Sequence, residues 1–228
     1  APVAAALARR ADVPFLSLTS GPHGLVAEVR AASARDIDHA VAEFRALPGV
    51  SAVDTLTYVE VMRDVIGPVG DVRTDLDDTD RALLAALQQD GRASYVALAA
   101  GVGLSAAGVR RRVVRLLDAR VVRIGAVVRH SGQDRQSAMG FGIRLTGGHH
   151  DVVAALTDMP AVIFVARTLG RFDVLVTVRA FAAAQLVELM DTVRGLPGVR
   201  TLESWTHLDV VKESYASGLD ASGLNAPG

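Results

Sequence analysis

The sequence predicts an α+β fold, with a winged helix-turn-helix domain between two ferredoxin-like domains of βαββαβ order. Three observations support this prediction: an internal repeat, the order of helix and strand patterns inside each repeat, and an arginine-rich helical pair between the repeats. The first ferredoxin-like domain is expected to lack its initial strand, because no strand pattern precedes its first helix.

The repeat aligns residues 3–62 with residues 152–211 at a constant offset of 149 positions, without a gap. Its matches fall on turns and apolar positions. The clearest are Phe15 with Phe164, Gly21 with Gly170, and Leu47-Pro48-Gly49-Val50 with Leu196-Pro197-Gly198-Val199. Counting back 149 residues from Leu76 puts the start of a full first unit about 75 residues upstream of Ala1. We therefore expect a piece of a longer tandem protein, with a further helix-turn-helix upstream.

Each copy is expected to hold a short helix, two strands joined by a glycine turn, a longer helix ended by Leu-Pro-Gly-Val, and a final alternating strand. The ranges are 3–10, 13–20, 25–30, 34–46 and 53–61 in the first copy, and 151–158, 162–169, 172–178, 182–194 and 201–211 in the second. A strand over 138–145 precedes the second copy and completes its βαββαβ order.

The stretch from Tyr95 to Leu117 is expected to form two helices joined by a Gly-Val-Gly-Leu turn, with Ser105 as the N-cap of the second. The second helix places apolar residues on one face and arginines on the remainder: Val109, Val113, Leu116 and Leu117 against Arg110, Arg111, Arg112 and Arg115. One face therefore suits packing and the other suits negative charge, which favours a recognition helix in the major groove of DNA. A helical hairpin with a solvated arginine face is the alternative.

The remaining segments complete the domain plan. A helix from Asp77 to Gly91 precedes the motif, with Asp77 and Asp80 in capping-box spacing at its start. Ser94 is expected to cap the first helix of the motif, and a wing strand or hairpin over 121–128 follows the second. The predicted units are an incomplete ferredoxin-like domain over 1–66, a linker over 67–75, the winged helix-turn-helix over 76–130, a linker over 131–136, a second ferredoxin-like domain over 137–213 and a flexible tail over 214–228.

Composition narrows the function. The net charge is −1, so any nucleic-acid surface must be local, and nine arginines against five aspartates between Leu76 and His130 leave that segment at +4. Cysteine is absent, which excludes disulfides, thiolate catalysis and cysteine-based zinc sites. The sequence has neither a long apolar run nor a signal-peptide pattern, so a cytoplasmic, nucleoid-associated location is expected, with no membrane partner.

The order of these motifs resembles the Lrp/AsnC (feast/famine) family of bacterial transcriptional regulators, in a tandem-fused, N-terminally incomplete form. Residues 76–213 resemble one full unit, and residues 1–62 resemble most of a second effector domain, called RAM in that family. The residues that carry the resemblance are Leu76, Asp80, Leu83, Leu84, Asp90-Gly91-Arg92, Leu104-Ser105, Val109, Arg111-Arg112-Val113, Arg115-Leu116, Gly170, Asp173 and Leu196-Pro197-Gly198-Val199.

The resemblance implies that RAM domains pair through their sheets into homodimers or larger assemblies. It also implies that an amino acid or similar metabolite binds between them, near the Gly-x-x-Asp hairpin; the site candidates are Thr168, Gly170, Asp173, Ser204 and Thr206. A carboxylate suits the ligand's ammonium group, although Asp173 could equally cap its own turn. Gly24 stands where Asp173 stands in the second copy, so the first copy is expected to bind differently or to serve as a structural partner.

DNA contacts are expected from the recognition helix and the segment after it: Ser105, Ala107, Gly108, Arg110, Arg111, Arg112, Arg115 and Arg123. Arg111 is best placed for a base edge, whereas Arg110, Arg112 and Arg115 suit phosphates and Ser105 offers its helix terminus to a phosphate. Ala107 and Gly108 can make only apolar contacts, while Arg123 and Arg129 could reach flanking backbone. This set favours modest sequence specificity and steep salt dependence.

Two other functions stay open. Ferredoxin-like domains of this layout also occur in tetrapyrrole-processing enzymes, and His130, His149, His150 and His207 could serve such a site. However, only two of these histidines are adjacent and no third ligand follows at recognisable spacing, so we expect neither a metal nor a cofactor, and no enzyme activity. A DNA-independent effector-binding module is the other alternative, if the helix-turn-helix is degenerate.

Overall fold

The computed structural model of the 228-residue chain describes residues 2–64, 67–68, 75–119, 121–125 and 137–214. Its elements are α1 (Pro2–Ala8), β1 (Phe15–Ser20), β2 (Leu25–Glu28), α2 (Ala34–Arg45), β3 (Thr57–Asp64), β4 (Gly67–Pro68), α3 (Asp78–Gln89), α4 (Tyr95–Val102), α5 (Ala106–Asp118), β5 (Ser137–Leu145), α6 (His150–Asp158), β6 (Val162–Leu169), β7 (Val174–Ala180), α7 (Ala183–Arg194) and β8 (Val199–Glu213). The predicted α+β class is confirmed.

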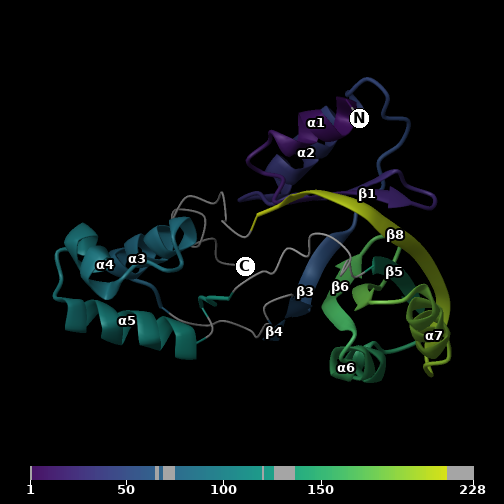
Figure 1. Cartoon of the computed structure of the whole chain (residues 1–228). Helices are drawn as coiled ribbons and strands as arrows, with labels where there is room; N and C mark the ends of the chain where they lie inside the picture. The colour runs from purple at the N-terminus through teal and green to yellow at the C-terminus, as the bar shows by residue number, and fades with distance from the viewer. Residues whose placement is uncertain (1, 65–66, 69–74, 120, 126–136, 215–228) are drawn as a thin grey trace.

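One antiparallel sheet joins both copies of the repeat, with the strand order β2-β1-β8-β5-β7-β6-β3-β4. Strand β8 makes this possible because it is 15 residues long. Its first part pairs with β5 and its last part pairs with β1. Figure 1 shows it as a long curved band that runs from β1 past β5.

The half from β5 to β8 has the expected βαββαβ order. Its core lies between the sheet and helices α6 and α7, and the inward side chains of the two central strands are fully buried. Phe141 and Ile143 of β5, and Val174, Val176 and Val178 of β7, each have 0% of their surface exposed. Burial of this extent is worth roughly 1.5–3 kcal/mol for each large apolar side chain, so β5 contributes much of this half's stability.

The half from α1 to β3 divides its strands between the two edges of that sheet. Strands β1 and β2 extend the edge at β8, whereas β3 extends the edge at β6. Helices α1 and α2 lie over β1, away from α6 and α7 (Figure 1). The final strand was expected from residue 53 but begins only at Thr57, so that prediction was wrong for residues 53–56.

The two pairings between the halves have the same register once the 149-residue offset is applied. Ser20 lies opposite Thr206 where β1 meets β8, and Leu169 lies opposite Thr57 where β6 meets β3. The same equivalence holds at the other end of the ladders, where Leu16 faces Lys212 and Val165 faces Arg63.

Side chains repeat this equivalence. Phe15 packs on His207 at 5.9 Å between ring centroids, and Phe164 packs on Tyr58 at 5.6 Å. Lys212 donates to the carbonyl of Arg10 at 2.6 Å, and Arg63 donates to the carbonyl of Met159 at 3.3 Å. In both cases a cation from one half binds the carbonyl-rich end of the first helix in the other half, where a positive charge is favourable. The interface between the halves is therefore built twice from equivalent positions.

Helices α3, α4 and α5 form a separate group around a small core (Figure 1). Leu83, Leu98, Val109 and Val113 meet there with at most 4% of their surfaces exposed. The expected N-caps are confirmed: Asp77 with a capping box, Ser94 and Ser105.

The predicted wing strand over 121–128 is absent from residues 121–125, and its remainder lies outside the described residues. The linker predicted over 131–136 and the tail beyond Ser214 also lie outside the described residues. Within the described ranges, no helix has the length and apolar character needed to cross a membrane.

Candidate nucleic-acid interface and ligand site

The turn between α4 and α5 is closed by local geometry. Gly103 adopts φ 67°, a left-handed conformation that favours glycine, and its N–H donates to the carbonyl of Ala99. Ser105 then begins α5, and its hydroxyl accepts from the N–H of Gly108 at 3.2 Å. The Ser105 hydroxyl is therefore occupied by capping, and an incoming phosphate would meet the remaining free N–H groups of this helix end.

The outward face of α5 carries Ala107, Arg110, Arg111 and Val114, all exposed. Among the described residues, the guanidinium groups of Arg110 and Arg111 have no hydrogen bond or ion pair to another side chain. Their charges are consequently free to meet an external anion. Gly108 lies at the edge of this face, half-buried beside Ser105.

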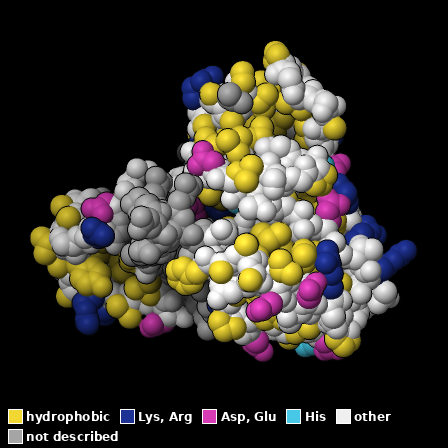
Figure 2. Space-filling model, turned by 45° about the vertical axis from the view of Figure 1, so that its right-hand side comes forward, with side chains coloured by type: hydrophobic (Ala, Val, Ile, Leu, Met, Phe, Trp, Pro, Cys, Tyr) yellow, Lys and Arg dark blue, Asp and Glu magenta, His cyan; other side chains and the backbone are white. Residues whose placement is uncertain are grey.

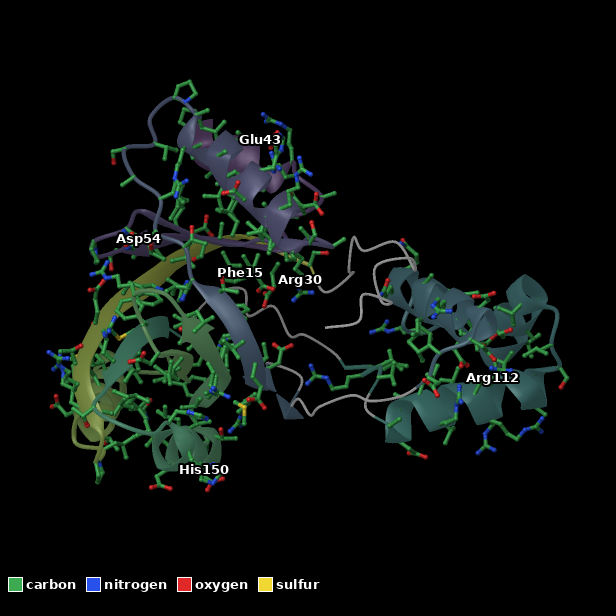
Figure 3. All side chains as sticks on the ribbon, turned by 180° about the vertical axis from the view of Figure 1, so that it is seen from behind. Phe15, Arg30, Glu43, Asp54, Arg112 and His150 are labelled. Atoms are coloured by element: carbon green, nitrogen blue, oxygen red, sulfur yellow. The ribbon has the colours of Figure 1, made fainter. Side chains whose placement is uncertain are left out.

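Arg112 and Arg115 are placed differently from Arg110 and Arg111. Both pair with Asp80 of α3, which keeps only 1% of its side chain exposed; the Arg112–Asp80 distance is 2.9 Å. Arg112 also binds Asp77 at 2.6 Å, and Figure 3 shows it on α5 on the side that faces α3. The hydrogen bond from the Asp80 N–H, with that from Arg112, holds the pKa of Asp77 below its usual range. These two arginines therefore brace α5 against α3.

Arg123 lies beyond α5 and contacts the end of β3. Its guanidinium binds Asp64 at 3.2 Å, with about a quarter of each side chain exposed (27% and 24%). Arg129, the other candidate for flanking contacts, lies outside the described residues. Of the described arginines predicted to meet DNA, Arg110 and Arg111 are thus the two whose guanidinium groups do not pair with another described side chain.

The predicted ligand residues around the β6–β7 turn form one structural unit. Gly170 adopts φ 131°, and a Cβ there would lie 2.8 Å from the carbonyl oxygen of Thr55, so only glycine lets the two halves approach this closely. The Asp173 carboxylate accepts from the N–H of Leu145 at 2.8 Å, which fixes the end of β5 to the turn. Thr168 is buried and donates to the carbonyl of Phe172 at 2.7 Å. Gly170, Asp173 and Thr168 therefore all stabilise the turn.

Ser204 and Thr206 lie on β8 but not on the face of this turn. The Ser204 hydroxyl contacts the Met190 sulfur at 3.7 Å, which places it on the side of helix α7. Side chains alternate along a strand, so Glu203 and Trp205 point to the opposite face. Trp205 there stacks on Phe172, with 6.4 Å between ring centroids. The five candidates are thus divided between two faces of the sheet.

A charge cluster that the sequence reasoning missed lies where the halves meet. Arg171 binds Asp54 at 3.1 Å, approaches His23 at 3.3 Å and pairs with Glu203. His23 in turn lies 3.3 Å from Asp54, which Figure 3 shows on the stretch between α2 and β3. The available signal was the repeat itself, because Asp54 and Glu203 are acids at equivalent positions.

Two buried polar atoms beside this cluster have no partner within the described part of the chain: Oε1 of Glu203 and Nε1 of Trp205. An acceptor and a donor left unsatisfied in a partly enclosed place are costly unless something binds them. Together with Arg171 they offer a negative acceptor, a neutral donor and a cation. That set matches the ammonium and carboxylate groups of a free amino acid.

The described histidines do not gather into a site, and the candidate His130 lies outside the described residues. His150 is exposed at the start of α6 (Figure 3), and His207 packs on Phe15 across the β1–β8 ladder. Among the residues that the structure describes, no group of three His, Asp or Glu side chains could hold a metal ion.

Comparisons with known families match the helix-turn-helix and most of the second half of the sheet. The AsnC-type helix-turn-helix domain family matches residues 76–117, and a C-terminal dimeric alpha+beta barrel domain family matches residues 148–220. The HTH-type transcriptional regulator Rv2324 of Mycobacterium tuberculosis is 30% identical over 132 residues, spanning 57% of this chain and 89% of the relative. The HTH-type transcriptional regulator FL11 of Pyrococcus furiosus is 26% identical over 151 residues, spanning 63% and 96%.

Solved structures of transcriptional regulators also superpose on this chain. The leucine response regulatory protein LrpA of Mycobacterium tuberculosis superposes with a TM-score of 0.51 at 30% identity, covering 59% of this chain and 93% of that one. The transcriptional regulator NMB0573 of Neisseria meningitidis, solved as a complex with L-Met, superposes with a TM-score of 0.51 at 26% identity, covering 62% and 96%.

Proposed function

The chain belongs to the Lrp/AsnC family of DNA-binding transcriptional regulators, and from this premise we propose how it meets DNA and what it senses. The recognition helix α5 enters the major groove, and an amino acid or related metabolite bound at the sheet changes DNA affinity or assembly. In this proposal the protein acts on chromosomal DNA in the cytoplasm, as a regulator rather than as an enzyme. The observation that carries the DNA proposal is the free charge of Arg110 and Arg111 on the outward face of α5.

Within α5 the roles divide by geometry. Arg111 reads a base edge and Arg110 binds a phosphate, with Ala107 and Gly108 making close apolar contacts at the helix start. The N–H groups behind Ser105 bind a second phosphate. Arg112 and Arg115 act indirectly, since their ion pairs with Asp80 hold α5 against α3.

Fluorescence anisotropy on a library of short duplexes tests this division. Arg111→Ala should weaken the selected duplex by roughly five- to 150-fold and relax its sequence preference, equivalent to about 1–3 kcal/mol for one lost base contact. Arg110→Ala should weaken all duplexes alike and lower the salt slope by about one unit. Arg35→Ala is the matched control, because it removes the same charge from an exposed position on α2. Unchanged binding by both α5 variants would overturn the proposal.

We also propose that residues 1–66 are a second RAM domain that pairs with the RAM domain of residues 137–213 inside one chain, with residues 76–130 as the DNA-binding domain between them. The matched registers and the matched aromatic and cation contacts support this arrangement. Homo-oligomers would then be built from chains that already contain one paired sheet.

The effector site is proposed where the Gly170 turn meets Asp54 and Glu203. Arg171 binds the ligand carboxylate, and Oε1 of Glu203 accepts from its ammonium group. Asp173 and Thr168 hold the turn in shape, while Ser204 and Thr206 support the strand from its other face. The complex of NMB0573 with L-Met supports an amino acid as the class of ligand.

A thermal-shift screen of the twenty amino acids tests the effector site, because a ligand that prefers the folded state raises Tm. The stabilising amino acid should lose its effect on Glu203→Gln. Glu188→Gln, an exposed position on α7, should respond like the native chain. Equal responses from both variants would place the ligand elsewhere.

A further inference from the structure

An ion pair at the end of strand β3 joins the DNA-binding helices to the sheet. Within the described part of the chain, α3, α4 and α5 make their extensive contacts with one another rather than with the sheet. The guanidinium of Arg123, which follows α5, binds the carboxylate of Asp64, the last residue of β3, at 3.2 Å. Figure 1 shows β3 and β4 at the side of the sheet that faces α5. This contact therefore connects the helices that meet DNA to the rest of the molecule.

The backbone around Arg123 belongs to the helical group. The N–H of Val121 donates to the carbonyl of Leu116 at 2.9 Å, so the chain turns back on the last turn of α5. Ile124 lies beside Gly91, just after α3, since a Cβ on that glycine would be 3.7 Å from the Ile124 side chain. Because contacts on both sides hold this stretch, Arg123 keeps its place at the C-terminal end of the recognition helix.

Asp64 is held from the other side, by the sheet. Its neighbour Arg63 donates to the carbonyls of Thr157 and Met159 at the end of α6, at 2.5 and 3.3 Å. Asp64 itself lies opposite Gly67 in the short ladder between β3 and β4. The carboxylate is thus presented by a well-anchored part of the sheet, and the pair with Arg123 fixes how the helical group sits against it.

Asp64 offers Arg123 the same kind of contact that DNA would offer. A carboxylate and a phosphate both present anionic oxygens that accept charge-assisted hydrogen bonds from a guanidinium. The C-terminal end of a recognition helix in the major groove lies near the sugar–phosphate backbone, where a cation contacts a flanking phosphate. The side chains of Arg123 and Asp64 are only 27% and 24% exposed, so Arg123 must leave Asp64 before it can donate fully to an outside phosphate. The two anions therefore compete for one guanidinium.

The other described arginines predicted to meet DNA are placed differently. Arg110 and Arg111 have no hydrogen bond or ion pair to another described side chain, and Figure 2 shows Lys and Arg side chains exposed on the helical group at the left. Arg112 and Arg115 pair within that group. Arg123 is the one among these described arginines that pairs with a residue of the sheet. Its charge is therefore available to DNA only when the group moves away from β3.

We propose that the Asp64–Arg123 pair is an autoinhibitory contact, which holds the helical group against the sheet and withholds one phosphate-binding cation from DNA. When the pair opens, Arg123 binds a phosphate that flanks the α5 site. The inference rests on the proposed DNA binding by α5 and adds to it a closed state of lower DNA affinity. One ionic partner of Arg123 replaces another in the exchange.

Fluorescence anisotropy tests the withheld cation, with the duplex that the native chain prefers and salt from about 50 to about 200 mM. Asp64→Asn should tighten binding roughly threefold to fivefold and make the slope of log K against log salt more negative by about 0.9, because one more phosphate is neutralised. Arg123→Gln should change the native affinity by less than about twofold, but it should abolish the gain when combined with Asp64→Asn. Asp38→Asn, which removes the same charge from an exposed position on α2, should bind like the native chain.

A second measurement reports the closed state without DNA. The chain has no cysteine, so Val96→Cys on α4 and Val187→Cys on α7, at positions 71% and 52% exposed, accept two spin labels at defined places. Double electron–electron resonance should give a narrow distance distribution between the labels in the otherwise native chain. The distribution should broaden after Asp64→Asn or Arg123→Gln, and it should stay narrow after Asp38→Asn.

Three results would overturn the inference: no tighter DNA binding by Asp64→Asn, a gain that survives Arg123→Gln, or a distance distribution that Asp64→Asn leaves narrow. Weaker binding by Asp64→Asn would mean that the pair holds α5 in its productive orientation. Arg111→Ala separates this inference from the proposed function. If Arg111→Ala still weakens binding while Asp64→Asn gives no gain, the autoinhibition alone is wrong; if Arg110→Ala and Arg111→Ala both bind like the native chain, both proposals are wrong.

Discussion

Equivalent positions in the two halves carry different side chains, and His207 shows the consequence. It occupies the position of Tyr58, packs on Phe15 and lies 3.0 Å from the Ser17 hydroxyl. Burial, with the nearby charge of Arg179, lowers its pKa from 6.5 to about 4. His207 is therefore neutral in the folded protein at neutral pH, whereas an unfolded histidine gains a proton near pH 6.5.

This difference predicts a pH-dependent stability. Between pH 6.5 and 4 the unfolded chain binds a proton that the folded chain does not, so stability falls as the pH falls through this window. The loss is on the order of 3 kcal/mol at pH 4 and none at pH 7. Urea denaturation at pH 7, 5.5 and 4.5 measures it. His207→Gln keeps a polar partner for Ser17 but does not titrate, so its stability curve should be flatter over this range; a curve as steep as the native one would assign the effect to other groups.

At the level of elements, local signals predicted the helices well. Asp77, Ser94 and Ser105 lie where the sequence suggested N-caps, because a cap depends on residues within one turn. The ending of α2 and α7 at their Leu-Pro-Gly-Val stretches was equally local. These boundaries need no knowledge of the rest of the fold.

Elements that depend on a distant partner were predicted less well. Residues 53–56 have a strand pattern but no strand: β5 pairs with their equivalents on β8, and no described strand pairs with residues 53–56. Arg112 and Arg115 were predicted as phosphate contacts from the helical wheel, which shows which face is polar but not which acid lies opposite it. Their pairing with Asp80 depends on how α5 crosses α3, which the pattern does not contain. Likewise, the ion pairs of Arg171 with Asp54 and Glu203 form only in the folded chain, where residues far apart in the sequence become neighbours.

The brace between α3 and α5 gives a prediction about these elements. Arg112→Ala with Arg115→Ala leaves Asp80, only 1% exposed, as a buried charge without its partners. The double variant should destabilise the three-helix group, seen as faster amide exchange at Val109 and Val113.

The control removes the stranded charge. Adding Asp80→Asn to the double variant should restore part of the loss, because a neutral amide is less costly to bury than an unpaired carboxylate. If instead the triple variant were less stable than the double variant, Asp80 would matter mainly as the partner of Asp77 in the capping box.

At the scale of the whole molecule, the two halves are stabilised through one sheet and one pair of close approaches. Gly170 of the second half lies against Thr55 and Leu56, and Gly21 of the first half lies against Ser204 and Trp205. Both glycines have positive φ, 131° and 113°. They differ in space, since a Cβ would lie 2.8 Å from the Thr55 carbonyl oxygen at position 170 but 3.4 Å from the Ser204 carbonyl oxygen at position 21.

Comparing alanine substitutions at Gly21 and Gly170 distinguishes the cost of backbone strain from the cost of disturbing the contact between the halves. Gly21→Ala and Gly170→Ala should both cost about 1–3 kcal/mol for an alanine in a left-handed conformation. Gly170→Ala should cost at least about 1 kcal/mol more, because a backbone oxygen of the other half must move to avoid the new methyl group. Urea denaturation of the two variants measures the difference, and the m value shows whether the halves still unfold together. Equal losses would mean that the approach at Gly170 relaxes freely, so that the two halves are joined by the strand ladders alone.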